Sequence, residues 1–520
     1  GTGTLTLSAG TTLTIAANGD IQAEGAVSLT GPSGISTAGD ITTSNDSITF
    51  NNPATFTGNS TLNSVAAALT MAAVTLADGV TLILGTGGGG TVSATSITGT
   101  AAGTASNVTF NVTGAVTVSG AIGTDIGTVT VTNSGGITFQ STVNAANVAL
   151  TNTTGNIQFT GNLTVGTALT TAAQAYNVIL QGTSNTIAGA TTFSNTGSVT
   201  IGNDATDTSA FTGGVVHTAG ATTVAGSVST TNSVITFAAI NASVDATLAA
   251  GSATITIGAA TLPDGVTLIL GTGGSGAISA AAITGTALGT ASNVTFNATG
   301  AVTVSGAIGT DIGTVTVTNS GGITFQSTVN AANVALTNTT GNIQFNDNLI
   351  VGTSLTTAAQ AYNVILQGAS NTIAGATTFS NTGSLTIGND ATDTSAFTGG
   401  VVHTAGATTV AGSVSTTNSV ITLAAVNPSV DSTLAAGSAT ITIGAATLPD
   451  GVTLILGSGG GGAISAAAIT GTAAGTASNV TFNVTGAVTV SGAIGTDIGT
   501  VTVTNSGGIT FQSTVNAANV

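Results

Sequence analysis

The sequence predicts an all-β protein, a right-handed parallel β-solenoid that forms an elongated rod with about 20 residues in each coil. Three observations lead to this fold class. The segment GAVTVSG at Gly114–Gly120 recurs from Gly300 and from Gly486, so the residue number rises by 186 each time (300 − 114 and 486 − 300). Each block divides again into units of about 20 residues, with alternating strands between polar turns. The chain is rich in small and β-branched residues and only 3% charged, which favours folded β-structure over disorder.

Two consecutive units define the coil. They are TVTVTNSGGITFQSTVNAAN, which begins at Thr128, and VALTNTTGNIQFTGNLTVGT, which begins at Val148. Because strand side chains alternate between faces, Val129 and Val131 should point inward and their threonine neighbours outward. The same rule places Phe139 and Phe159 inward, at equivalent positions of the two units. We therefore expect these two rings to stack on adjacent coils.

Other units are looser, with spacings of roughly 18 to 25 residues, so that about nine coils fill one block. The domain organisation predicted is a divergent first repeat (1–113), two repeat copies (114–299 and 300–485) and a truncated copy (486–520). We expect one continuous rod that is a piece of a longer protein. The alanine clusters at 66–73 and 277–282 are interpreted as coil positions, with a short helix as the alternative.

The charge balance excludes several classes of partner. The chain has no Lys or Arg, 17 acidic residues and a net charge of −17. Nucleic-acid binding requires cations that neutralise phosphate, so it is not expected. No apolar run is long enough for a transmembrane helix, so membrane insertion is not expected either. There is no cysteine, hence no disulfide framework. The lack of sites for trypsin suits a durable extracellular or cell-surface protein.

Acidic residues in one repeated loop are candidate metal ligands. Asp204 and Asp207 recur as Asp390 and Asp393, each pair preceded by asparagine. Carboxylate and amide oxygens are the ligands that calcium prefers, so calcium, or another divalent cation, is the candidate ligand; the alternative is a solvated turn. Asp78-Gly79 and its copies indicate turns, and Asp125, Asp311 and Asp497 are interpreted as corner residues.

Three asparagines beside glycine-containing turns, Asn133, Asn152 and Asn195, are candidates for a structural ladder. Stacked side-chain amides can hydrogen-bond from coil to coil. The alternative is that asparagine is present there only because it tolerates turn conformations.

No catalytic constellation or cofactor-binding motif is recognisable, and we do not expect an enzyme. Glycoside hydrolysis needs two suitably spaced carboxylates, and a repeated Asp pair is a poor way to build a single site. His217 and His403, the only histidines, are copies of each other without Ser or Asp partners at a recognisable spacing. A surface position is expected for both.

The runs NVTFNVTGAVTVSGAIGTDIGTVTVTNSGGITFQ and AYNVILQGTSNTIAGATTFSNTGSVTIGND resemble the large β-strand-repeat surface proteins of bacteria. They are similar in style to the solenoids of filamentous haemagglutinin and of autotransporter passengers. The resemblance covers essentially the whole chain, and it implies a solenoid architecture in an adhesin, a sheath component or a matrix fibre.

We therefore expect a structural component of an extracellular bacterial fibre, sheath or matrix, whose main partner is the chain itself, as a homopolymer or a lateral bundle. The first alternative is a passive stalk of an adhesin whose binding tip lies outside this segment. The minor alternatives are ice binding through pairs such as Thr128 and Thr130, and carbohydrate binding. Carbohydrate binding would lack its usual aromatic platforms, since there is no Trp and only two Tyr.

Overall fold

The computed structural model describes residues 3–100, 103–286, 289–472 and 475–520. Every regular element among these residues is a β-strand, all registered pairings are parallel, and the coils stack at about 21 residues per turn. The predicted all-β solenoid is confirmed. The chain divides into a first unit, Gly1–Gly258, and a second unit, Ala259–Val520.

The strands of the first unit are β1 (Leu5–Ser8), β2 (Leu13–Ile15), β3 (Ile21–Ala23), β4 (Val27–Thr30), β5 (Ile35–Thr37), β6 (Ile41–Thr43), β7 (Ile48–Phe50), β8 (Ala54–Phe56), β9 (Ser60–Asn63), β10 (Leu69–Leu76), β11 (Thr81–Leu84), β12 (Val92–Gly99), β13 (Ser106–Asn111), β14 (Val116–Val118), β15 (Ile122–Gly123), β16 (Ile126–Asn133), β17 (Ile137–Phe139), β18 (Val143–Leu150), β19 (Asn156–Phe159), β20 (Leu163–Thr171), β21 (Asn177–Leu180), β22 (Ser184–Ile187), β23 (Thr191–Thr192), β24 (Val199–Ile201), β25 (Thr208–Phe211), β26 (Val215–Ser229) and β27 (Ile235–Ala249).

Strand β28 (Ile255–Leu262) contains the division between the units. The strands of the second unit are β29 (Thr267–Leu270), β30 (Ile278–Ala280), β31 (Ile283–Gly285), β32 (Ser292–Asn297), β33 (Val302–Val304), β34 (Ile308–Gly309), β35 (Ile312–Asn319), β36 (Ile323–Phe325), β37 (Val329–Leu336), β38 (Asn342–Phe345), β39 (Leu349–Thr357), β40 (Asn363–Leu366), β41 (Ser370–Ile373), β42 (Thr377–Thr378), β43 (Leu385–Ile387), β44 (Thr394–Phe397), β45 (Val401–Ser415), β46 (Ile421–Ala435), β47 (Ile441–Leu448), β48 (Thr453–Leu456), β49 (Ile464–Ala466), β50 (Ile469–Gly471), β51 (Ser478–Asn483), β52 (Val488–Val490), β53 (Ile494–Asn505), β54 (Ile509–Phe511) and β55 (Val515–Asn519).

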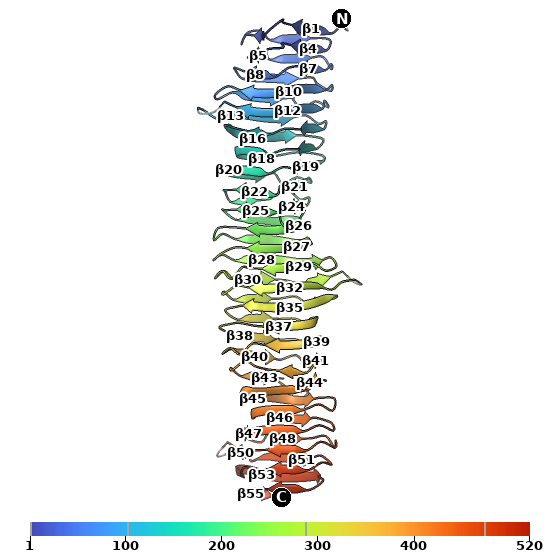
Figure 1. Cartoon of the computed structure of the whole chain (residues 1–520), viewed down its shortest axis with the longest axis vertical. Coiled ribbons are helices and arrows are strands. Elements are labelled where there is room, and N and C mark those ends of the chain that lie inside the picture. The colour runs from blue at the N-terminus through green and yellow to red at the C-terminus, as the bar shows by residue number, and fades with distance from the viewer. Residues whose placement is uncertain (1–2, 101–102, 287–288, 473–474) are drawn as a thin grey trace. The chain divides into compact units, whose positions relative to one another are not determined.

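One turn of the solenoid has three straight segments. In the first unit, β17 supplies the first segment and β18 the other two, before β19 starts the next turn directly above β17. Ile137 pairs with Ile157, Val143 with Leu163, and Val148 with Leu169. Within each unit, successive turns follow one another along a common axis (Figure 1). Each inward side chain therefore lies directly above its equivalent in the previous turn.

Inward positions form continuous columns that are mostly apolar. The column that passes through Ile137 in the first unit runs over twelve turns: Leu5, Val27, Ile48, Leu69, Val92, Val116, Ile137, Ile157, Val178, Val199, Thr222 and Ile240. Apart from Leu5, all of these side chains are buried. Burial of such a column along every face is the main stabilising term of the fold.

The predicted inward residues are in place. Val129, Val131 and Leu150 are fully buried, and the rings of Phe139 and Phe159 stack with centroids 4.8 Å apart and an interplanar angle of 17°. The equivalent pair, Phe325 and Phe345, stacks at 4.7 Å. Both alanine clusters overlap strands, β10 and β30, so the helical alternative is wrong.

Strained corners recur once per block. Thr124 and Asp125 have φ values of 52° and 56°, and their copies at 310–311 and 496–497 share this left-handed conformation. A β-branched residue rarely adopts it. Neighbouring backbone holds the corner in place, because the N–H groups of Gly99 and Ser106 donate to the carbonyl oxygens of Thr124 and Asp125 at 2.7 and 3.0 Å.

No helix among the described residues has the length and apolar character needed to cross a membrane.

Candidate functional site

One extended surface feature of the first unit is a row of outward side chains that we call the hydroxyl row. It follows the inward column of the first unit, one residue further along each strand, and nine of its twelve members carry a hydroxyl group. The members are Thr6, Ser28, Thr49, Thr70, Ser93, Thr117, Thr138, Gln158, Ile179, Thr200, Thr223 and Asn241.

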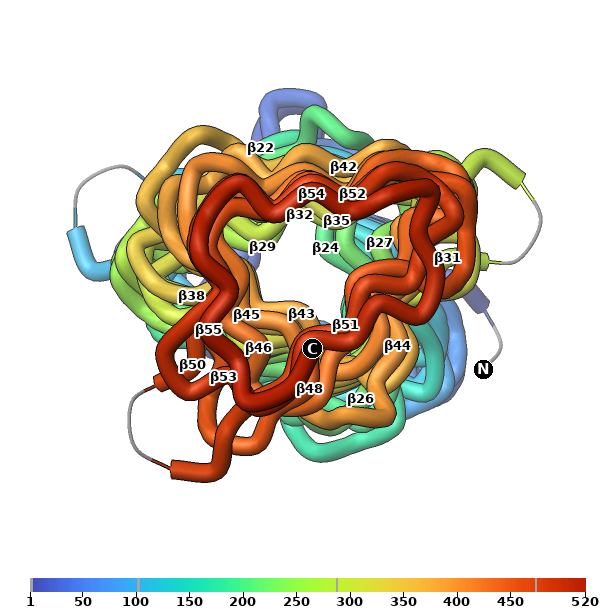
Figure 2. The backbone as a smooth tube through the Cα atoms, turned by 90° about the horizontal axis from the view of Figure 1, so that it is seen from below, coloured from blue at the N-terminus to red at the C-terminus, as the bar shows by residue number. Residues whose placement is uncertain are grey.

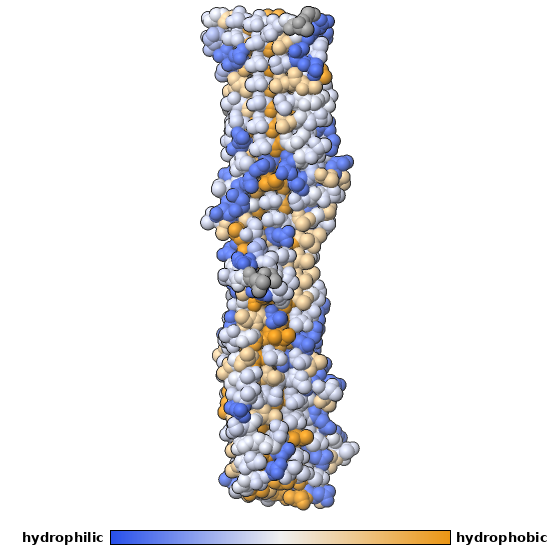
Figure 3. Space-filling model, turned by 90° about the vertical axis from the view of Figure 1, so that its right-hand side faces the viewer, coloured by the Kyte–Doolittle hydropathy of each residue, from blue (hydrophilic) through white to orange (hydrophobic). Residues whose placement is uncertain are grey.

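Every member of the hydroxyl row is at least partly exposed. Near the middle of the row, the residues directly before and after each member on its strand are buried. The row contains no charged residue over twelve turns, although the chain carries 17 acidic groups. Within each unit, the face in Figure 3 is mostly of intermediate hydropathy, with strongly hydrophilic residues scattered over it and hydrophobic residues along its middle. The row itself is neutral and regular, and its members are polar except for Ile179.

Two rows of the same kind lie in the second unit. One consists of Ser279, Thr303, Thr324, Gln344, Ile365, Thr386, Thr409 and Asn427. The other consists of Thr378, Val402, Thr422, Thr442, Ser465, Thr489 and Thr510. Both rows are free of charge, like the row of the first unit.

The structure brings two of the three predicted ladder asparagines together. The Nδ2 atom of Asn152 donates to Oδ1 of Asn133, and Nδ2 of Asn133 donates in turn to Oδ1 of Asn111, both at 2.8 Å. The same chain of amides joins Asn338, Asn319 and Asn297. Hydrogen bonds between side-chain amides thus link three consecutive turns at each of these two places.

Asn195 lies elsewhere, in the interior. Its side chain is fully buried, and Nδ2 donates to the carbonyl oxygen of Tyr176 at 3.0 Å. Its Oδ1 atom has no hydrogen-bond partner among the described residues. The inward corner side chains of two earlier turns are Ser134 and Thr153, which hydrogen-bond to each other at 2.6 Å. The side chain of Asn195 points inward, as these two do, and it does not point in the same direction as the side chain of Asn133.

The expected surface position of the histidines is wrong, since His217 and His403 are both fully buried. Nδ1 of His217 lies 2.9 Å from Oγ1 of Thr222, and Nε2 lies 3.3 Å from the carbonyl oxygen of Asn195. The ring also meets Phe193 edge to face at a centroid distance of 6.2 Å. Strand alternation explains the burial, because Val215 and His217 point the same way on β26.

Burial lowers the pKa of His217 below its usual value of 6.5, and the same holds for His403; hydrogen bonds to backbone oppose the shift only in part. The desolvated ring is therefore neutral at pH 7. One ring nitrogen then donates and the other accepts. The Thr222 hydroxyl can donate to Nδ1 or accept from it. When it donates to Nδ1, the ring proton is on Nε2, which then donates to the Asn195 carbonyl.

Tyr176 belongs to the same interior region. Its hydroxyl donates to the Leu150 carbonyl at 2.7 Å and accepts the Ala172 N–H at 3.0 Å. Burial raises the pKa of Tyr176. We call Tyr176, Asn195, His217 and Thr222 the buried polar cluster. Its copy in the second unit is formed by Tyr362, Asn381, His403 and Thr408.

The four predicted metal ligands lie in two equivalent turns and are occupied by hydrogen bonds within those turns. Oδ2 of Asp207 accepts the N–H groups of Asn203 and Asp204 at 2.8 and 3.0 Å. Oδ1 of Asp204 accepts both the N–H and the hydroxyl of Thr206, which lowers the pKa of Asp204. Asp390 and Asp393 repeat this arrangement.

No group of three or more His, Asp or Glu side chains within the described ranges is arranged to hold a metal ion. The two Asp side chains of each turn would have to exchange their backbone partners for a cation. Calcium therefore has no preformed cage of carboxylates at these positions.

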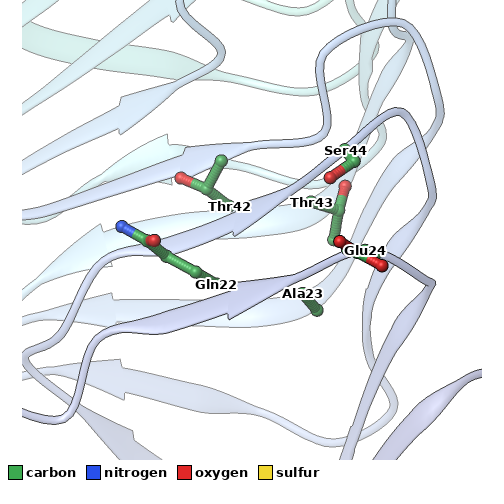
Figure 4. A pocket seen from close by; sticks show the side chains of 6 residues that line it. All are labelled: Gln22, Ala23, Glu24, Thr42, Thr43 and Ser44. Atoms are coloured by element: carbon green, nitrogen blue, oxygen red, sulfur yellow. The ribbon is translucent and has the colours of Figure 1, made fainter. Parts of the chain in front are cut away.

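A surface pocket of about 350 Å³ lies between two neighbouring turns of the first unit (Figure 4). Gln22 on β3 pairs with Thr42 on β6, and Glu24 lies with Thr43 and Ser44 at the corner where both strands end. Glu24 is its sole carboxylate. The pocket lacks the pair of acids that glycoside hydrolysis requires.

The hydroxyl row could have been found from the sequence by aligning the alternating triplets of successive units, because each triplet such as Val116-Thr117-Val118 has one outward position. The buried polar cluster gave no comparable signal. Its members come from three different turns, and their meeting depends on the register between those turns.

No family model, no curated protein and no solved structure matches this chain.

Proposed function

We propose that this chain is a structural component of an extracellular bacterial fibre, sheath or matrix, in which copies of the chain associate side by side. The observation that carries the proposal is the hydroxyl row, which offers an uncharged and regular contact surface over twelve turns. The proposed role is mechanical. Backbone pairing along the axis distributes load, and the number of turns sets the length.

The solenoid is suited to growth by duplication. Each turn contacts chiefly its neighbours, so adding a block lengthens the stack without redesigning a core. The near-identical blocks that begin at Gly114 and Gly300 are the trace of such growth. The likeness in style to filamentous-haemagglutinin and autotransporter-passenger solenoids supports the surface location.

A specific observation favours a second candidate, the passive stalk of an adhesin. The net charge is −17 with no cation to offset it, and a large net charge of one sign keeps molecules apart. A stalk whose binding tip lies outside this segment needs no contact with its copies. The balance between the neutral row and the negative total charge decides between the two roles.

The test is to add charge to the hydroxyl row. In the double variant Thr117→Glu/Thr200→Glu, two carboxylates stand on the row four turns apart, too far to repel each other strongly within one molecule. Electron microscopy and sedimentation should show assemblies of the unmodified chain and their loss in this variant.

The matched control is Ser44→Glu/Thr91→Glu, which adds the same charge at exposed positions outside the row. Circular dichroism checks that all proteins are folded. Equal loss of assembly in both variants would show that total charge is what matters. An unmodified chain that stays monomeric under all conditions would favour the stalk.

A further inference from the structure

The register of the second unit gives the number of turns in one sequence block. Ten residues of one continuous inward column lead from Val302 to Ile494: Val302, Ile323, Ile343, Val364, Leu385, Thr408, Val426, Ala446, Ile469 and Ile494. We call it the first column. Its nine steps lead from Val302 to Ile494, and one turn averages about 21 residues.

The sequence block is shorter than these nine turns. The copy of Val302 is Val488, which precedes Ile494 in the chain and lies outside the column that Ile469 and Ile494 share. Val488 stands above Ile464 instead. It belongs to a second column: Thr377, Val401, Ile421, Ile441, Ile464, Val488 and Ile509.

A single turn shows how the two columns are related. Starting from Val426 in the first column, the chain passes Leu434 on another face, then Ile441 in the second column, and reaches the first column again at Ala446. The path along the chain from Val426 in the first column to Ile441 in the second is thus one face short of a complete turn. A block that moves from the first column to the second has made about eight and two-thirds turns.

The same displacement carries surface features around the axis. Strands β31 and β50 are copies of each other, and Figure 2 shows them on different sides of the second unit. The row segment Ser279, Thr303 and Thr324 recurs as Ser465, Thr489 and Thr510 on the next face. At about 4.8 Å per turn, the copy lies roughly 40 Å further along the axis.

We propose that the fractional block length gives the second unit contact surfaces for second copies of this chain on two of its three faces. The neutral row recurs one face further round in the next block, so neighbouring chains can dock on two faces of this unit instead of one. A block of nine whole turns would place every copy of the row on one side. Docking on two faces builds assemblies of more than two chains across, whereas docking on one face builds pairs.

A second copy is the occupant that the charges favour. Both rows of the second unit are uncharged, and the chain has no Lys or Arg with which to bind an anionic partner. Two such faces can meet without placing carboxylates opposite each other. The bundle geometry rests on the proposed function, while the placement of the rows does not.

The placement is tested by nitroxide labels in a chain that has no native cysteine. In Ser465→Cys/Thr489→Cys, the labels lie on adjacent turns of one face and should broaden each other's EPR spectrum strongly. In Thr470→Cys/Thr489→Cys, they lie on different faces and should not, because Thr470 pairs with Gly495. The matched control is the earlier copy, Ser279→Cys/Thr303→Cys.

Strong broadening in the 470/489 variant, with little in the 465/489 variant, would mean that Thr489 stacks on Thr470 and would overturn the fractional block. The second measurement is electron microscopy of assembled chains. Assemblies of more than two chains across are expected. Pairs of chains or isolated rods would overturn docking on two faces, and isolated rods would also contradict the proposed function, while the EPR result on placement would stand.

Discussion

The first unit contains two kinds of polar network, one at a partly exposed corner and one in the interior. The asparagine ladder at Asn111, Asn133 and Asn152 lies at a partly exposed corner, and each amide finds its partner in the next turn. The buried polar cluster around His217 lies inside the columns, draws on backbone carbonyls, and leaves Oδ1 of Asn195 unpaired. A ladder can extend for as long as the corner repeats. A buried cluster has to be assembled once from several turns.

This difference predicts unequal sensitivities. Removing a buried group leaves its partners without water or a hydrogen bond, which costs about 1–3 kcal/mol for each polar group left behind. Removing a ladder amide exposes its neighbours to solvent, which replaces most of what is lost. The following changes are ordered from the largest expected effect to the smallest.

The largest effect is expected for His217→Ala. It removes a buried ring, opens a cavity beside Phe193 and leaves the Thr222 hydroxyl unpaired. We expect a loss of roughly 2–4 kcal/mol of local stability. Hydrogen exchange of β26 and of the turns next to it would measure this loss, because solenoids open locally. The control is the outward neighbour Val216→Ala, and equal losses in both variants would contradict the account.

Acid should weaken the buried polar clusters before the ladders. His217 has a lowered pKa and is neutral when folded, whereas the unfolded chain takes up a proton near pH 6.5. The stabilisation is therefore complete above that value and falls as the pH drops below it. Between pH 7 and pH 5, protection from exchange, measured relative to the intrinsic exchange rate at each pH, should fall more at β26 and β45 than at β16.

The variant His217→Gln sharpens this prediction. It should remove the acid response around β26 and leave it intact around β45, where His403 remains as an internal control. If the two copies responded alike in the variant, the histidine could not be the cause of the acid sensitivity.

A smaller effect is expected for Asn133→Ala, which breaks two ladder bonds at a partly exposed corner. We expect a loss of about 1 kcal/mol in the turns on either side. Hydrogen exchange at β16 and β18 would detect it, with Thr132→Ala as the neighbouring control. A loss as large as that for His217→Ala would remove the distinction between the two polar networks.

The smallest effect is expected for calcium. Because the Asp204 and Asp207 carboxylates already accept hydrogen bonds within their turn, adding calcium or EDTA should leave the unfolding temperature unchanged. A calcium-dependent rise that is abolished in Asp204→Asn/Asp390→Asn would instead establish these turns as cation sites.

Much of the fold was predictable because it depends on local alternation. The inward positions of Val129, Ile137 and Phe159 follow from the alternation of strand side chains, and their stacking follows from the repetition of one unit along the chain. The burial of His217 follows the same alternation, because His217 points the same way as Val215 on β26. The inward direction of Asn195 was not predictable in this way. It depends on corner geometry, where one residue more or less changes the side of the strand that a side chain occupies.

The candidate site was predictable only in part, for a related reason. Outward threonines such as Thr117 and Thr138 are visible in the sequence, but their continuity over twelve turns is a property of register. The fractional block length is likewise hidden. Because the turns differ in length, the ninth turn of the first column ends at Ile494. The sequence block already repeats at Val488, before that turn is complete.

The central claim is that neutral faces bring copies of this chain together in spite of its charge. Sedimentation velocity of the purified chain, at several protein concentrations in low and high salt, tests it most directly. Salt shortens the range of repulsion to about 3 Å at 1 M, so association should increase with both protein concentration and salt. A single slowly sedimenting species under every condition would contradict the claim.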